Sequence, residues 1–281
     1  MTRRFIAFRN VLKVWLVLAI VTALFVAAGW EIGGYRVALL FGGSVVLLAG
    51  TVYAYADRIV MGMLGARELA EGEAPALYSL VDRLASQARV VKPRLYVLPD
   101  SYPRALSAGR GAGGGSGLAV SVGLLGVASP AELEGIVAHE IAHLRNRDVL
   151  PQTVVSIIAS AIIESSRIGG YLQRGFLFVL GPIAASFVHL VLSPNREYEA
   201  DRYAAELCDS PHGLADALLR FEQSMGLVEF QASPATEPMY TVDPFAPEGV
   251  AALFQTHPPL GERVRRLREL DDEWRGRLQA A

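Results

Sequence analysis

Residues 139–143 read His-Glu-Ile-Ala-His, and three side chains of this segment could do metal chemistry. On a helix, side chains four positions apart project from the same face, so His139 and His143 can both reach one metal ion. Glu140 lies about 100° further round the helix axis, close enough to act on a water molecule at that metal. Because such a pentapeptide also occurs by chance on buried helices, the rest of the chain must supply a third ligand.

The third ligand is predicted in residues 196–201, which read Arg-Glu-Tyr-Glu-Ala-Asp. A catalytic zinc takes three protein ligands and keeps one position open, and two histidines with one glutamate are a standard set. Glu197 can complete that set. Asp201 lies four positions further on the same helix face and can accept the second N–H of a ligand histidine. The alternative is a solvated, charged helix face, which the neighbouring histidine motif makes less favoured.

A helix over residues 129–148 is predicted on independent grounds. Ser129 is a good N-cap residue, Pro130 suits the first helical position, and Glu132 completes a capping box. The apolar residues that follow recur at helical spacing, which gives the helix a face to bury; they are Leu133, Ile136, Val137, Ile141 and Leu144.

The composition indicates a membrane protein. Of the 281 residues, 52% are hydrophobic and 19% charged, and the mean hydropathy is +0.33, which is too apolar for an ordinary soluble domain. The net charge is −2 and no lysine-rich block occurs, so we expect no nucleic-acid partner. The single cysteine, Cys208, excludes an intrachain disulfide and fits a reducing compartment.

Four apolar runs organise the chain into hairpins. Residues 11–30 and 37–56 are each long enough to span a bilayer and are joined by a short turn at 31–36. A signal peptide is the competing interpretation, but no clear cleavage site precedes a polar mature chain. The basic residues that flank the pair place both of its ends in the cytoplasm. Residues 149–163 and 176–193 form a weaker second hairpin, which either crosses the membrane, is partly immersed, or is buried against the catalytic domain.

These segments divide the chain into four parts. They are a transmembrane hairpin (1–58), a first part of the catalytic domain (59–148), the second hydrophobic hairpin (149–193) and the rest of the catalytic domain (194–281). Within them we predict a helix over 66–90, a strand over 94–98, a flexible hairpin loop over the glycine-rich 109–117, an irregular loop over 231–249 and a charged helix over 262–278. The strand-like residues 118–125 are either an edge strand that pairs with extended substrate or a plain core strand.

The ordered motifs resemble those of the HtpX-type integral-membrane zinc metallopeptidases, relatives of the endopeptidases that process prenylated CAAX proteins. The resemblance covers nearly the whole chain. It implies that His139 and His143 bind zinc, that Glu140 is the catalytic base, that Glu197 is the third ligand, and that Asp201 supports a ligand histidine.

One further motif and one departure belong to this resemblance. Residues 256–259 with Arg263 match the family's Thr-His-Pro-Pro-x-x-x-Arg ending, which implies that His257 stabilises the oxyanion of the substrate carbonyl. From the residues alone, His257 reads as a turn histidine before a helix. Arg104 stands where the family commonly has an asparagine, which puts in doubt whether this loop makes the family's substrate contacts.

We therefore expect a mainly α protein with a small β-sheet, an α+β zincin-like catalytic domain joined to transmembrane helices. The expected activity is that of a zinc endopeptidase with one Zn²⁺ per chain, in the inner cell membrane, with its active site facing the cytoplasm. The resemblance implies that its substrates are misfolded or damaged membrane proteins or unfolded polypeptides, in protein quality control and stress response. The rival functions are a CAAX-type prenyl-protein endopeptidase and a non-catalytic zinc-containing membrane scaffold. The sequence does not fix an oligomeric state.

Overall fold

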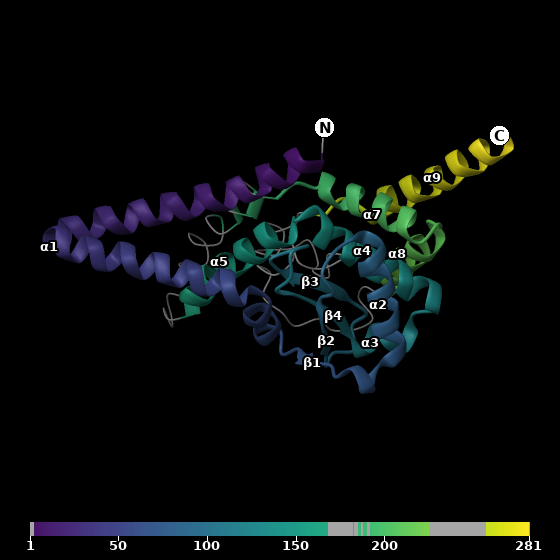
Figure 1. Ribbon diagram of the computed structural model, residues 1–281, viewed down its shortest axis with the longest axis horizontal. Helices are drawn as coiled ribbons and strands as arrows, with labels where there is room; N and C mark the ends of the chain where they lie inside the picture. The colour runs from purple at the N-terminus through teal and green to yellow at the C-terminus, as the bar shows by residue number, and fades with distance from the viewer. Residues whose placement is uncertain are drawn as a thin grey trace.

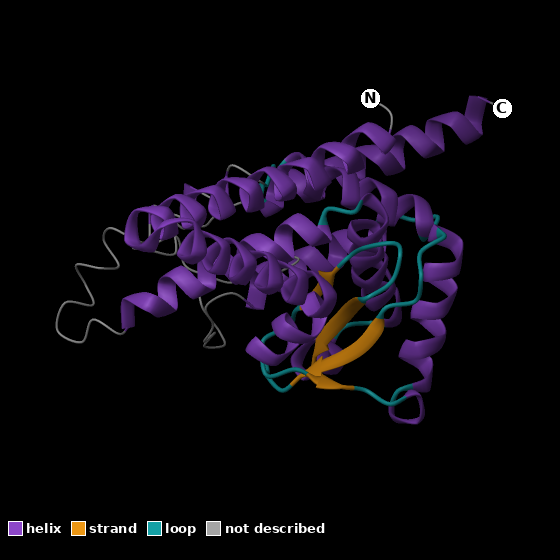
Figure 2. Cartoon of the chain, turned by 60° about the vertical axis from the view of Figure 1, so that its left-hand side comes forward, coloured by secondary structure: helices purple, strands orange, loops and turns teal. Residues whose placement is uncertain are grey.

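The computed structural model describes residues 3–167, 192–224 and 257–280, together with positions 182, 185, 186, 188 and 189. As predicted, the chain is mainly helical with a small sheet. A long helical hairpin projects from the side of this domain (Figure 1), and the strands lie together under the helices (Figure 2). The predicted loop at 231–249 and most of the predicted span at 176–193 lie outside these residues.

Helix α1 (Arg3–Met63) is a hairpin of two antiparallel arms, because the chain reverses at Gly33 and Gly34. Gly34 has φ 65° and ψ −158°, a backbone conformation open essentially to glycine alone. The reversal falls inside the turn predicted at 31–36. The arms pack closely, with the rings of Phe25 and Phe41 6.3 Å apart between centroids. Among the described residues, α1 is the one helix long and apolar enough to cross a membrane, and its Leu18–Met63 part has a mean hydropathy of 2.0.

Four strands form one mixed sheet in the order β1-β2-β4-β3. They are β1 (Arg67–Glu68), β2 (Arg94–Leu98), β3 (Ala105–Gly109) and β4 (Ser116–Ser121). Strand β4 pairs in parallel with β2 and antiparallel with β3. The strand predicted at 94–98 and the hairpin loop predicted within 109–117 are confirmed.

The strand predicted over 118–125 was wrong beyond residue 121, and the edge-strand alternative was wrong too. Strand β4 is flanked on both sides, so it is the plain core strand, and the edge next to it is β3, which the sequence did not reveal. The strand ends because the hydroxyl of Ser121 accepts a hydrogen bond from the Leu124 N–H at 3.0 Å. That bond caps the short helix α3 (Val122–Val127).

Both faces of the sheet are buried, because alternate strand residues are apolar on either side. One face packs on helices α2 (Pro75–Ala88), α4 (Pro130–Asn146) and α8 (His212–Ser224) through Leu95, Leu118 and Val120. The opposite face, with Leu98 and Leu106, packs on the end of α1. The sheet is therefore sandwiched between the metal-motif helix and the base of the apolar hairpin.

The remaining helices close the domain around α4. They are η1 (Glu71–Glu73), α5 (Val149–Arg167), α7 (Asn195–Leu207) and α9 (Leu260–Ala280). The helix predicted from residue 66 begins instead at Pro75, which takes a first-turn position because it cannot donate within a helix. The charged helix predicted at 262–278 is confirmed within α9.

Helix α5, the first arm of the predicted second hairpin, is buried along its first three turns against α1 and β3. The backbone N–H of Gly109, at the end of β3, donates to the hydroxyl of Thr153 on α5 at 3.0 Å. A second polar contact fastens the apolar hairpin to the sheet: Arg94 at the start of β2 donates to the buried carboxylate of Asp57 near the end of α1. The end of the hairpin is therefore packed against the rest of the domain and joined to it by a polar contact.

Helix α4 lies unusually close to α8 because glycine occupies the contact on both helices. A Cβ added at Gly135 would lie 2.5 Å from the backbone nitrogen of Leu214. A Cβ added at Gly213 would collide with the backbone oxygen of Ala131. Because the obstructing atoms are backbone, neither contact can be relieved by moving a side chain.

We predict that Gly135→Ala lowers the free energy of unfolding by about 1–3 kcal/mol or more, since the extra methyl forces α8 away from the metal-motif helix. Denaturant unfolding of the purified chain in detergent measures the change. Gly126→Ala is the matched control, because a Cβ at this helical position meets nothing within 4 Å, and it should be neutral or slightly stabilising. Equal stability of the two variants would contradict the close helix contact.

Candidate metal centre

Helix α4 begins as the sequence predicts. The Ser129 hydroxyl accepts from the backbone N–H of Glu132 at 3.3 Å, and the Glu132 carboxylate accepts from the backbone N–H of Ser129 at 2.7 Å. Arg220 on α8 donates to the same glutamate at 2.8 Å. The capping box fixes the start of the helix, and the helix carries the histidine motif two to three turns further into the buried interior.

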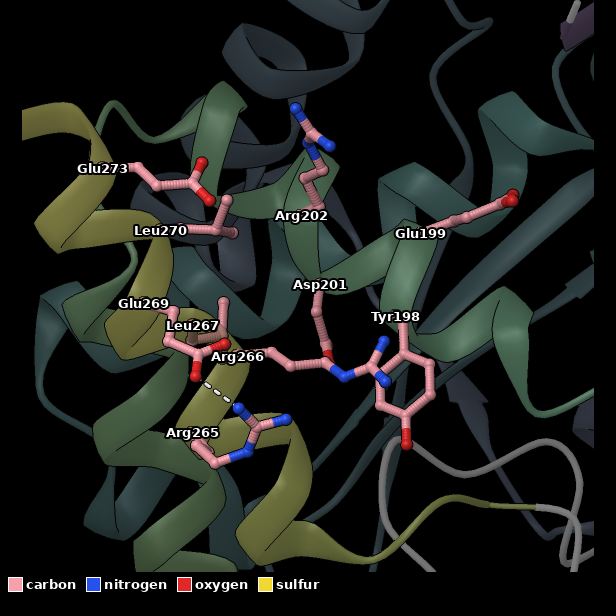
Figure 3. A pocket seen from close by; sticks show the side chains of 10 residues that line it. All are labelled: Tyr198, Glu199, Asp201, Arg202, Arg265, Arg266, Leu267, Glu269, Leu270 and Glu273. Atoms are coloured by element: carbon pink, nitrogen blue, oxygen red, sulfur yellow. Dashed lines mark hydrogen bonds and ion pairs between the residues drawn. The ribbon is translucent and has the colours of Figure 1, made fainter. Parts of the chain in front are cut away.

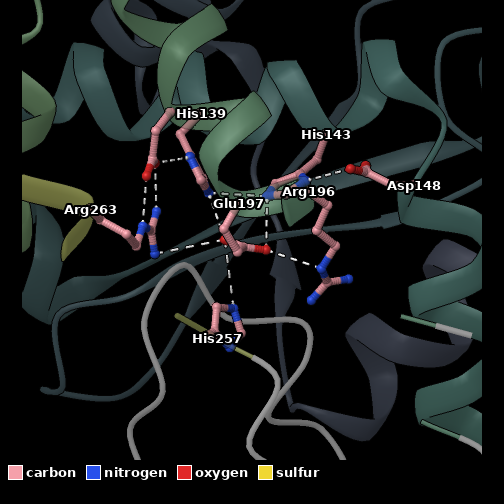
Figure 4. A network of polar contacts seen from close by, with 8 residues as sticks. His139, His143, Asp148, Arg196, Glu197, His257 and Arg263 are labelled. Carbon is pink, nitrogen blue, oxygen red and sulfur yellow. Dashed lines mark hydrogen bonds and ion pairs between the residues drawn. The ribbon is translucent and has the colours of Figure 1, made fainter. Parts of the chain in front are cut away.

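The structure brings the predicted ligands together (Figure 4). Ligand atoms of His139, His143 and Glu197 all lie within 4.8 Å of one another, and all three side chains are buried. Among the residues that the structure describes, this is the one group of three or more such side chains close enough to share a metal ion. The two histidines come from α4, and the glutamate comes from the first turn of α7.

Each histidine has its own carboxylate on the far side of the ring. His139 Nδ1 lies 3.0 Å from Asp201 Oδ1, the contact predicted for Asp201. His143 Nδ1 lies 3.1 Å from Asp148 Oδ2. Asp148 can fold back on the helix because Arg147 adopts a left-handed conformation (φ 60°) that ends α4 and turns the chain.

These contacts test whether a metal fits. The hydrogen bond with Asp148 assigns the ring proton of His143 to Nδ1, and Asp201 lies beside Nδ1 of His139, so the Nε2 atoms of both rings, 3.0 Å apart, can face one cation. Both carboxylate oxygens of Glu197 are buried and make no hydrogen bond, although nitrogen atoms of Arg196 and Arg263 lie 3.1 and 3.7 Å from them. Two facing lone pairs and an unsatisfied buried carboxylate are costly unless a cation lies between them. The residues present therefore fit a metal ion.

The electrostatics of the site favour positive charge. Burial opposes protonation of His143, yet Asp148 and Glu197 outweigh it and raise the pKa of His143 well above its ordinary value. Burial alone would raise the pKa of Glu197, but His257 and His143 hold it well below its ordinary value. The same negative potential stabilises either a proton on His143 or a metal cation. The proton and the metal compete for the same nitrogen atom.

The other two predicted residues lie beside the ligands. Glu140 is buried on α4 next to His139. The side chain of His257 is only 4% exposed and points at the ligand group, with Nε2 3.8 Å from Glu197 Oε2 (Figure 4). The structure therefore brings all six predicted site residues into one cluster.

Sequence reasoning missed three members of this cluster. The contact of Asp148 with His143 was not predicted. The Nε atom of Arg196 lies 3.1 Å from Glu197 Oε1, and Arg263 of α9 donates to Asp201 through two nitrogen atoms. Arg196 sits beside the predicted ligand and Arg263 closes the Thr-His-Pro-Pro motif, so both could have been suspected from position, although neither contact follows from spacing.

Arg104, the residue that departs from the family pattern, has a local role in the structure. Its guanidinium donates to Asp100 at 2.6 and 3.1 Å, and its backbone N–H donates to the Ser121 hydroxyl at 3.0 Å. The arginine therefore ties the loop before β3 to the end of β4.

A helix that carries the two-histidine motif, with a glutamate from a second buried helix, defines the metal-dependent peptidases. The family model described as peptidase family M48 matches residues 71–271, so this chain belongs to that family. The enzyme is a metallopeptidase, and its apolar α1 supports association with a membrane.

Known relatives agree along nearly the whole chain. A "Protease HtpX homolog" of Pelotomaculum thermopropionicum is 38% identical over 276 residues, 92% of this chain and 98% of the relative. A "Protease HtpX homolog" of Pyrococcus abyssi is 35% identical over 92% of this chain and 95% of its own length. The crystal structure of S. mikatae Ste24p aligns with a TM-score of 0.47 and 17% identity, over 92% of this chain and 64% of that chain.

We predict that Asp148→Ala weakens metal binding by about 10–100-fold, because His143 loses the partner that fixes its ring. Asp148→Asn should weaken metal binding less, since its amide oxygen can still accept a hydrogen bond from Nδ1–H of His143. Competition with a chelator of known affinity measures both. Asp82→Ala removes an exposed aspartate that pairs with Lys92 and should leave metal affinity unchanged; a similar loss in this control would contradict the assignment.

Proposed function

We propose that this protein is a zinc-dependent endopeptidase that cleaves membrane proteins at the cytoplasmic face of the cell membrane. The observation that carries the proposal is the convergence of His139, His143 and Glu197 around one point, with Glu140 on the adjoining helix position. The unsatisfied oxygens of Glu197 and the facing histidine nitrogens support the binding of a cation. The two-histidine, one-glutamate donor set suits zinc and leaves a coordination position open.

In this proposal two residues of the chain act beside the metal ligands. A bound zinc ion would act as a Lewis acid toward water and the scissile carbonyl. Glu140 takes the proton of the attacking water and returns it to the leaving amine. His257 faces the same space from the segment just before α9 and donates a hydrogen bond to the oxygen on which negative charge develops.

Two crossings of the membrane by α1 are supported by its length and by its aromatic residues. The predicted span at 37–56 has 20 residues, about 30 Å of helix, which matches a bilayer core. Trp30 and Tyr35 are exposed at the tip of the hairpin, and Tyr53 and Tyr55 are exposed near its base, as expected for side chains at the two membrane surfaces. The basic residues that flank the hairpin support a cytoplasmic location of the catalytic domain.

A role in the quality control of membrane proteins is the proposed biological function. The resemblance to HtpX-type peptidases implies it, and the short path between membrane and site supports it. Helix α5 begins directly after Asp148, the partner of His143, and packs against the apolar hairpin. A substrate released from the bilayer therefore meets the metal centre close to the hairpin.

We predict that Glu140→Gln lowers the rate of cleavage of an unfolded membrane-protein substrate by about 100-fold or more, because the amide cannot accept the proton of the water. Metal content should stay equal to that of the native protein, since Glu140 is not one of the ligands. Glu134→Gln, which removes a partly exposed glutamate of the same helix paired with Arg83, is the control. Equal cleavage by the Glu140 variant and the native enzyme would refute the mechanism.

For topology, we predict that Ile32→Cys in a Cys208→Ser background is labelled in intact cells by a membrane-impermeant thiol reagent. Ile32 is 72% exposed at the tip of the hairpin, the end expected to face away from the cytoplasm. Glu273→Cys on α9 should be labelled only after the membrane is permeabilised. The reverse pattern would place the metal centre on the other side of the membrane.

A further inference from the structure

Arg263 is a fully buried arginine that contacts the metal centre from the C-terminal helix. Its side chain is 0% exposed. Its Nε donates to Asp201 Oδ2 at 2.8 Å, and its second terminal nitrogen donates to Asp201 Oδ1 at 2.7 Å. This two-pronged geometry fixes both the position and the plane of a carboxylate, which a single hydrogen bond cannot do.

The carboxylate that Arg263 holds is the one that faces His139. Asp201 Oδ1 receives Arg263 at 2.7 Å and also lies 3.0 Å from His139 Nδ1. The contacts of these three groups therefore connect α9 through α7 to α4. A rotation of the Asp201 carboxylate would therefore move its contact with the His139 ring.

Arg263 also balances the charge of the buried site. Burial opposes its positive charge, but Asp201, Glu197 and Glu140 together raise the pKa of Arg263 above its ordinary value. Its remaining terminal nitrogen lies 3.7 Å from Glu197 Oε2. Three buried carboxylates on one side of the site are costly without compensating charge. Arg263 supplies the compensating positive charge beside Asp201, which is not one of the three proposed metal ligands.

We propose that Arg263 is a positioning residue of the metal centre, which locks Asp201 so that Asp201 orients His139 toward the metal. The inference rests on the proposed ligand set of His139, His143 and Glu197. It makes docking of α9 onto α7 a requirement for tight metal binding, although α9 supplies none of the three ligands.

The neighbouring Arg266 provides a matched control. It lies one turn further along α9, at a surface pocket of about 520 Å³ between α7 and α9 (Figure 3). Its guanidinium stacks 3.7 Å from the ring centroid of Tyr198 and donates to Glu262 at 2.7 Å. Arg266 therefore joins the same two helices as Arg263, but from their exposed side.

The test compares Arg263→Gln, Arg263→Lys, Asp201→Asn, the Arg263→Gln/Asp201→Asn double variant and Arg266→Gln in the purified full chain. Zinc affinity is measured by chelator competition, and the visible absorption of the Co²⁺-loaded protein reports the geometry of the ligands. The unfolding temperature of the metal-free protein is measured separately. A merely structural arginine would change that temperature and leave the affinity and the spectrum as they are.

We expect Arg263→Gln to weaken zinc binding by about 10–100-fold and to shift the Co²⁺ spectrum. The zinc affinity of Arg263→Lys should lie between those of the native protein and Arg263→Gln, because lysine keeps the positive charge but loses the paired hydrogen bonds to Asp201. The double variant should bind zinc no more weakly than Asp201→Asn alone, since the arginine acts through that aspartate. Arg266→Gln should bind zinc as the native protein does.

Two results would overturn the inference. One is zinc affinity of the Arg263→Gln variant within twofold of the native value, and the other is a double variant whose loss equals the product of the two single losses. If Arg263→Gln does not fold, the lysine variant and the double variant decide, because the double variant leaves neither buried charge unpaired. A native protein that fails to bind zinc would instead refute the ligand set itself.

Discussion

The central constraint on this structure is that the Nε2 atoms of His139 and His143 face each other. Asp148 and Asp201 each take the Nδ1 side of a ring, which leaves the two Nε2 atoms 3.0 Å apart and directed at one point. That arrangement is unfavourable in a dry interior unless a cation joins the nitrogens. The elements around α4 serve this constraint: the left-handed turn at Arg147 returns Asp148, and α7 brings Glu197 and Asp201 on one face.

The apolar hairpin is part of the catalytic domain rather than a tether. Residues at the end of α1 pack on one face of the sheet while the metal-motif helix packs on the other. The Arg94–Asp57 pair adds a polar contact that is buried on the Asp57 side. A displacement of the hairpin would therefore be carried to α4 through only the thickness of one sheet. This geometry couples the position of the apolar hairpin to that of the metal-motif helix.

Local chemistry made much of this predictable from the sequence. The capping box at Ser129 and Glu132, the period of the apolar residues and the spacing of Glu197 and Asp201 depend on neighbours within one or two turns, and each is found where expected. The edge strand β3 was missed because its small residues give no β signal. The Arg263–Asp201 pair joins residues 62 positions apart, and the contact of Asp148 depends on one backbone turn, so neither follows from spacing alone.

The position of Arg263 in the chain also bears on how the enzyme is made. Synthesis runs from the N-terminus, and about 200 residues separate the end of α1 from Arg263. At about 5–20 residues per second, this corresponds to on the order of 10–40 s of translation. During that interval the hairpin can enter the bilayer while Asp201 still lacks its partner. The contacts around Asp201 are therefore complete only after α9 has been synthesised.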